Sequence, residues 1–194
     1  MLTLIAGLLL FLGVHSLRIF AEPWRQHMRE RLGAGAWKGL YALLSLAGFG
    51  LLLWGFGRAR LDPVLLWSPP PWLRHPAALL LVPAFILLVA AYIPGTRIRA
   101  AIGHPMLAGV QLWALAHLLV NGRLHDLVLF GSFLVWSVLA FASARARDRR
   151  AGTRYAVQGR GRDAAAIVVG LLACAGFAQF AHLPLIGVQP FGAP

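Results

Sequence analysis

The feature that most constrains this chain is a series of six long apolar runs separated by short, arginine-rich gaps. Each run is about long enough for a helix to reach across a bilayer core, and none alternates at every second residue as a barrel strand would. With 59% apolar and only 12% charged residues, the chain has too little charged surface for a soluble fold. The sequence therefore predicts an all-α, polytopic membrane helix bundle with six transmembrane helices, forming a single integral membrane domain over residues 1–194. The six runs are Leu2–Phe20, Trp37–Gly57, Ala77–Tyr92, Pro105–Val120, Leu127–Ser143 and Ala164–Ala181.

The distribution of basic residues predicts how the helices are oriented. With six spans, the gaps after the first, third and fifth runs lie on one side of the membrane and, together with the run ends that adjoin them, carry 14 of the 18 basic residues. The positive-inside rule places this side in the cytoplasm and both termini outside, in a bacterial inner membrane. No basic residue precedes Leu2, and the first arginine is Arg18, the reverse of the order in a cleaved signal peptide. We therefore expect the first run to be a retained span.

Composition also excludes several classes of function. The formal net charge is +12, but the positive charges lie in gaps between apolar runs, so membrane topology explains them better than nucleic-acid binding does. The single cysteine, Cys174, excludes an intramolecular disulfide and a CxxC redox pair. Carboxylates are almost absent from the runs, which argues against a proton relay or a coupled transporter. The candidates for a functional site within the predicted spans are therefore histidines.

His15 is the candidate in the first span. It follows Gly13 and precedes Ser16, two small residues that let a neighbouring helix approach. One interpretation is a helix-packing histidine whose N–H is hydrogen-bonded, and the other is a metal or haem ligand. Spacing alone leaves both open and favours the packing role.

His117 is the candidate in the fourth span. At 100° per residue it shares one helix face with Met106, Val110, Trp113 and Asn121. This face carries a thioether, an indole and an imidazole, so it could line a haem pocket or form the packing seam with the fifth span. The Asn121-Gly122 pair predicts a tight turn into that span.

The remaining histidines are expected near the ends of the spans. His104 precedes Pro105 and should be the cap residue of the fourth helix, about 20 Å along the helix from His117. The two cannot ligate one iron if that helix is straight, although His104 matches His15 in predicted depth. The other histidines should be solvated or interfacial; they are His27, His75, His125 and His182.

The stretch from His104 to Gly122, His-Pro-Met-Leu-Ala-Gly-Val-Gln-Leu-Trp-Ala-Leu-Ala-His-Leu-Leu-Val-Asn-Gly, resembles the NnrU family of bacterial membrane proteins. The early Gly13-Val-His-Ser16 segment, the basic first loop and the length with six spans resemble it too, so the likeness covers essentially the whole chain. The resemblance implies a role in denitrification and nitric oxide metabolism.

The family is also similar to plant zeta-carotene isomerase, a haem b membrane protein that isomerises a double bond of a polyene. This similarity implies haem b as cofactor, with His15 and His117 as iron ligands and His104 as an alternative partner for His15. The relative has a cysteine, implicated in redox-dependent ligand exchange, where this chain has Ala114. Haem binding therefore carries over more directly than that exchange. Arg18, Arg97 and Arg99 could hold the haem propionates, although the positive-inside rule alone also accounts for them.

Three functions follow from these observations. The leading hypothesis is a haem-binding protein that uses iron for redox-gated, isomerase-like chemistry on a lipophilic small molecule. The second is a non-catalytic assembly or scaffold component in which the histidines are structural. The third is a membrane methyltransferase resembling isoprenylcysteine carboxyl methyltransferases, which also carry a His-Pro motif. It ranks lowest because the fifth run and the loop after it contain no glutamate. The sequence leaves the oligomeric state undetermined.

Overall fold

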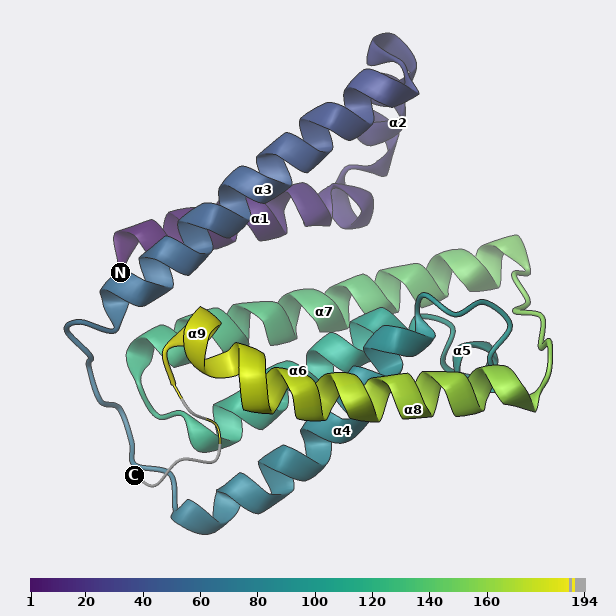
Figure 1. The fold of residues 1–194 in the computed structure, drawn as a ribbon. Helices are drawn as coiled ribbons and strands as arrows, with labels where there is room; N and C mark the ends of the chain where they lie inside the picture. Colours follow the sequence, from purple (N-terminus) through teal and green to yellow (C-terminus); the bar gives the residue numbers. More distant parts are fainter. Residues whose placement is uncertain (189, 191–194) are drawn as a thin grey trace.

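A computed structural model describes residues 1–188 and 190, and every regular element it assigns there is helical. The prediction of an all-α membrane protein is confirmed. Figure 1 shows the order of the main helices. They are α1 (Leu2–Phe20), α2 (Glu22–Leu32), α3 (Ala34–Ala59), α4 (Arg74–Ala90), α5 (Arg97–Ile102), α6 (Pro105–Val120), α7 (Leu124–Ala151), α8 (Arg160–Gly176) and α9 (His182–Ile186). A 3-10 turn at Pro71–Leu73 precedes α4, and a π-helical turn at Phe177–Ala181 joins α8 to α9.

Five helical stretches of the described chain are long and apolar enough to cross a membrane, whereas α6 is shorter. The stretches are Leu2–Phe20, Ala34–Ala59, Pro71–Ala90, Leu124–Ala151 and Arg160–Ile186. The predicted fourth run corresponds to α6, whose 16 residues rise about 24 Å. Helix α7 has 28 residues and is much longer than the predicted run Leu127–Ser143, because its helix continues through an arginine-rich segment. The short helices α2 and α5 fall in segments for which the sequence predicted no helix.

Much of the protein surface is apolar, as a lipid environment requires. Large apolar side chains point outward along the long helices, and the interior is built largely from alanine and glycine. Small interior residues let helix backbones approach closely where apolar side chains gain nothing by leaving lipid. Apolar residues with more than 60% exposure include Leu2, Leu9, Leu43, Leu46, Leu79 and Leu172. Buried alanines include Ala77, Ala84, Ala90, Ala114, Ala116, Ala140, Ala144 and Ala166.

Glycines set the register of the antiparallel α1–α3 pair. A Cβ atom on Gly7 would lie 2.5 Å from the backbone nitrogen of Leu52, and one on Gly48 would lie 2.8 Å from that of Phe11. Gly55 meets the backbone of Leu4 still more closely. No side chain fits at these crossings, so the two helices can pack backbone to backbone only in this register.

Helix α7 joins this pair to the second group of helices, α4, α6 and α8 (Figure 1). Helix α7 follows α6 after the short turn predicted at Asn121-Gly122, and it packs against both α6 and α1. The main apolar core lies where α1, α3, α6 and α7 meet. Its buried members are Leu4, Leu8, Leu52, Ala114, Leu129 and Phe130.

The long helices alternate in direction, which gives the bundle two ends. The connections α1–α3, α4–α6 and α7–α8 share one end, where Arg147 donates a hydrogen bond to the Arg18 carbonyl and Ile98 N–H donates one to Asp163. We call this the basic end, because it contains Arg18, Arg97, Arg99 and Arg145 to Arg162. At the opposite end, residues 61–70 cross the α6–α7 turn, and the N–H groups of Leu66 and Trp67 both donate to the Gly122 carbonyl.

Candidate functional site

His15 lies half-buried on α1 with its ring orientation determined by its own helix. Its Nδ1 is 2.7 Å from the Phe11 carbonyl, and since a carbonyl can only accept, Nδ1 carries the proton. The imidazole also contacts rings from two other helices, Tyr41 of α3 and Trp136 of α7. This arrangement leaves the Nε2 lone pair as the free ligating atom, which is the tautomer that metal-binding histidines use.

His117 repeats the same arrangement on α6. Its Nδ1 donates to the Trp113 carbonyl over 2.8 Å, again leaving Nε2 as the acceptor nitrogen. The imidazole stacks on Phe130 of α7, with ring centres 4.5 Å apart and an interplanar angle of 25°. Asn121 donates to the His117 carbonyl, which stabilises the end of the helix just beyond it.

A continuous set of aromatic rings connects the two imidazoles. The Phe133 ring of α7 contacts Phe11 beside His15 and Trp113 beside His117, at centre-to-centre distances of 5.9 and 5.5 Å. It also contacts Trp136. We call these rings the aromatic cluster. Its members are Phe11, His15, Tyr41, Trp113, His117, Phe130, Phe133 and Trp136.

The cluster brings His15 and His117 together as neighbours but not as a facing pair. His15 contacts Trp136 and His117 contacts Phe130, two positions six residues apart on α7, or about 9 Å along its axis. Phe133 lies between these positions. A porphyrin that joins both imidazoles would therefore have to displace the Phe133 ring.

An open groove of about 550 Å³ runs between α1 and α7 beside His15. Small residues of both helices line it, as does Trp136, which contacts the His15 ring. Apolar side chains line the rest. The lining residues are Leu9, Leu12, Gly13, Ser16, Ile19, Phe20, Gly131, Ser132, Val135, Trp136 and Leu139.

His104 belongs to a different cluster at the basic end. It is the cap residue of α6, as predicted, but its side chain makes no cap hydrogen bond. Its Nε2 instead donates to the Asp148 carboxylate over 2.9 Å, and the Tyr155 hydroxyl donates to the same oxygen over 2.8 Å. The partners of this imidazole thus differ completely from those of His15 and His117.

The three arginines proposed for propionates also lie at the basic end. Arg18 is one helical turn beyond His15, and its carbonyl accepts a hydrogen bond from Arg147. Arg97 begins α5, and Arg99 lies over the Tyr155 ring at 5.4 Å. Arg18 is therefore close in sequence and depth to the aromatic cluster, whereas Arg97 and Arg99 accompany His104.

The expectation that His125 is solvated or interfacial is wrong. It is 2% exposed, packs against Phe56, and its Nε2 lies 3.5 Å from Asp126 with no hydrogen-bond partner among the described residues. The cause is tertiary, because residues 61–70 and the end of α3 cover the start of α7. The apolar Leu129, one turn after His125 on the same face, is the sequence signal that could have indicated burial.

The Tyr155 phenol should titrate above its ordinary value of 10.0, because burial raises its pKa and the hydrogen bond to Asp148 raises it further. Replacing Asp148 with asparagine should lower the Tyr155 pKa toward the ordinary value. Since the folded pKa exceeds the unfolded one, this phenol stabilises the fold at lower pH, and the contribution disappears as pH rises through the folded value. Ultraviolet titration, with Tyr155→Phe to assign the signal, measures the shift; an unchanged Tyr155 pKa in Asp148→Asn would contradict the hydrogen bond.

The comparisons with known proteins agree with the sequence and the fold. The family model described as NnrU protein matches residues 3–190, nearly the whole chain, so the protein belongs to the NnrU family. Neither the curated proteins nor the solved structures contain a match. Among the described residues there is no group of three or more His, Cys, Asp or Glu side chains that could hold a metal ion.

Proposed function

We propose that this NnrU protein binds haem b in a bacterial inner membrane and acts in denitrification or nitric oxide metabolism. The observation that carries the proposal is the matched pair of imidazoles on the aromatic cluster. Both His15 and His117 donate Nδ1–H to the carbonyl four residues earlier, and both keep Nε2 for a ligand. A packing histidine could make the same hydrogen bond; what favours a ligand role is that both Nε2 atoms have no hydrogen-bond partner among the described residues.

The donor set fits a haem. Neutral imidazoles are the commonest protein ligands of haem iron, and surrounding aromatic rings provide the dry, apolar contact that a porphyrin requires. His15 and His117 would hold the iron with the Phe133 ring displaced from between them, and Arg18 would lie nearest for a propionate. Bound haem would supply a redox-active iron, while the chain's own residues fix the ligand tautomers and exclude water from the cluster.

A lipophilic molecule is the substrate class that the surroundings favour. The groove between α1 and α7 is lined by exposed apolar side chains such as Leu9, Val135 and Leu139, and it reaches Trp136, which also contacts His15. A molecule dissolved in the bilayer could therefore reach the edge of the aromatic cluster without crossing water. Redox-gated isomerisation is the reaction we propose for such a substrate. Ala114 lies completely buried in the apolar core and provides no thiol for ligand exchange.

The orientation we propose places the basic end in the cytoplasm. The concentration of arginine there supports this assignment, because basic loops are retained on the cytoplasmic side. Both termini would then lie outside, and α6 would complete a sixth passage with the help of its neighbours. The arrangement is consistent with the alternating directions of the helices.

Absorption spectroscopy of the purified protein tests haem binding. We expect the protein, expressed with ample haem and purified in detergent, to show a Soret band that shifts on reduction. A folded protein without this band after haem supplementation would overturn the proposal and favour the non-catalytic scaffold. Helical circular dichroism of the same sample establishes that it is folded.

A further inference from the structure

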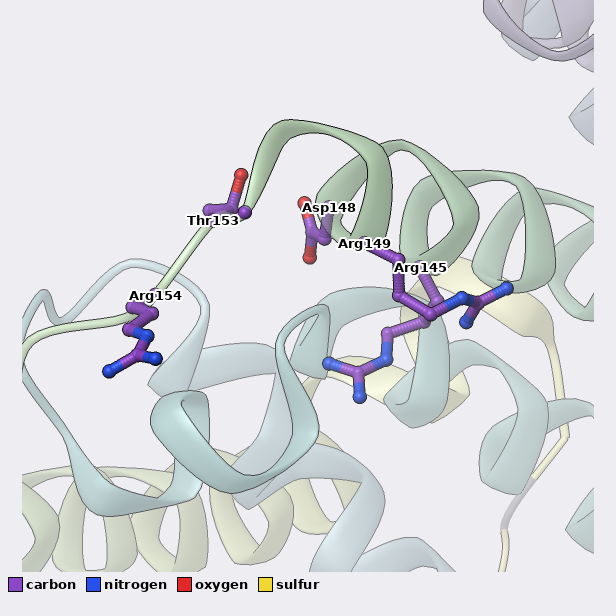
Figure 2. A pocket seen from close by; sticks show the side chains of 6 residues that line it. Arg145, Asp148, Arg149, Thr153 and Arg154 are labelled. Atoms are coloured by element: carbon purple, nitrogen blue, oxygen red, sulfur yellow. The ribbon is translucent and has the colours of Figure 1, made fainter.

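A hollow at the basic end is lined by three arginines from the end of α7 and the segment after it. It has a volume of about 220 Å³ and lies apart from the aromatic cluster. Figure 2 shows Arg145 and Arg149 on the last turns of the helix and Arg154 on the segment that follows, with Asp148 between them. The helix stops at Gly152, whose left-handed conformation at φ 61° turns the chain so that Arg154 lines the same hollow.

These arginines have no counter-ion within the described residues. The arginine ion pair found there, Arg25 with Glu22, lies in α2. Asp148 is the acidic residue in the hollow, but its Oδ2 already accepts hydrogen bonds from His104 and Tyr155. The side chains of Arg145, Arg149 and Arg154 make no hydrogen bond to the described protein. Three positive charges therefore face one partly engaged negative charge.

One of the guanidiniums is held in place before any ligand binds. A Cβ atom on Gly103 would lie 2.8 Å from Nη1 of Arg145 and 3.4 Å from the Tyr155 ring, so the arginine rests directly on the Gly103 backbone. Gly103 has φ of 80°, a conformation that other residues rarely adopt. The Arg99 guanidinium lies over the Tyr155 ring. The hollow thus has one preformed side, made by Arg145, while Arg149 and Arg154 are exposed at its edge.

The length of α7 places the hollow at the membrane surface. Its 28 residues rise about 42 Å, more than the roughly 30 Å hydrocarbon core. The last turns, which begin near Arg145, project into the region of the lipid headgroups. Anions at this depth are chiefly the phosphates of lipids, together with phosphates dissolved in the adjoining water.

We propose that Arg145, Arg149 and Arg154 form a binding site for a phosphate-bearing anion. The planar forks of arginine bind two oxygens of a phosphate at once, and this geometry distinguishes a defined site from general attraction to a charged surface. The headgroup of an anionic phospholipid and a free phosphate share this chemistry. The proposal does not depend on haem binding, because none of these three residues contacts the aromatic cluster.

Thermal unfolding of the purified full-length protein with three probes tests the site. The probes are short-chain phosphatidylglycerol, short-chain phosphatidylcholine as the zwitterionic comparison, and inorganic pyrophosphate. We expect phosphatidylglycerol or pyrophosphate to raise Tm in a saturable way and phosphatidylcholine to have a much smaller effect. If phosphatidylglycerol saturates the shift at the lower concentration, the ligand is a lipid headgroup; if pyrophosphate does, the ligand is a free phosphate.

A pair of charge-matched variants separates the site from diffuse charge. Arg145→Gln/Arg149→Gln/Arg154→Gln removes the hollow's guanidiniums, and Arg29→Gln/Arg31→Gln/Arg150→Gln removes three basic side chains from the same end that do not line it. The first variant should bind the effective probe about tenfold or more weakly, and the second should bind within about twofold of the original protein. Equal weakening in both variants, or no saturable shift with either anionic probe, would overturn the proposal.

Discussion

Replacing Gly7 with valine should disrupt the α1–α3 pair and destabilise the protein by about 3 kcal/mol or more. A Cβ atom at this position would approach the backbone of Leu51 and Leu52 to 2.5–2.8 Å, and a backbone cannot move aside as a flexible side chain can. The helices would have to separate along their whole contact. Because α1 also carries His15 to the aromatic cluster, the change should alter the environment of Trp136 as well.

Gly50→Val is the matched control for this substitution. Gly50 lies on α3 near the same level, yet a Cβ atom there would meet nothing within 4 Å. The control adds the same side chain toward the lipid and should leave the unfolding temperature nearly unchanged. Thermal unfolding in detergent, followed by tryptophan fluorescence, measures both variants. Equal stability of the two would show that the glycine register does not hold the pair together.

The second large effect concerns the imidazoles. His15→Ala and His117→Ala should each lower haem occupancy by at least about tenfold or shift the Soret band, because each removes a preset ligand nitrogen. Absorption spectra of equal amounts of folded protein give the comparison. His27→Ala is the control, since His27 lies exposed on α2 outside the aromatic cluster. It should retain the original spectrum.

The two single variants also distinguish between modes of ligation. If both imidazoles hold one iron, each substitution should change the coordination seen in the spectrum. If one histidine acts alone, only its variant should do so, which the different depths of the two rings would explain. Unchanged spectra in both variants of a haem-loaded protein would exclude His15 and His117 as ligands.

The helices of this protein were largely predictable from sequence, because in a bilayer each backbone polar group must be satisfied within its own segment. The apolar runs locate the long helices to within a few residues at most ends. The turn at Asn121-Gly122 and the capping position of His104 were also correct. Helix α7 was the main exception, because its helix extends through polar residues that hydropathy does not count as a span.

The candidate site was only partly predictable. Local sequence singled out His15 and His117, and each makes its Nδ1 hydrogen bond within its own helix. Their neighbours come from other helices, so the aromatic cluster could not be identified from the spacing within one run. The same holds for His104, whose partners Asp148 and Tyr155 lie more than forty residues away.

The sequence by itself determined that this is a helical membrane protein of the NnrU family, where its long helices lie and which residues could serve as ligands. Hydropathy and helix capping depend on local sequence, so they set the positions of the helices whatever the tertiary packing. Only the tertiary structure decided the glycine register of α1 and α3, the burial of His125, and the gathering of Arg145, Arg149 and Arg154 around one hollow. All three features depend on contacts between segments far apart in the chain, and no local sequence pattern specifies such contacts.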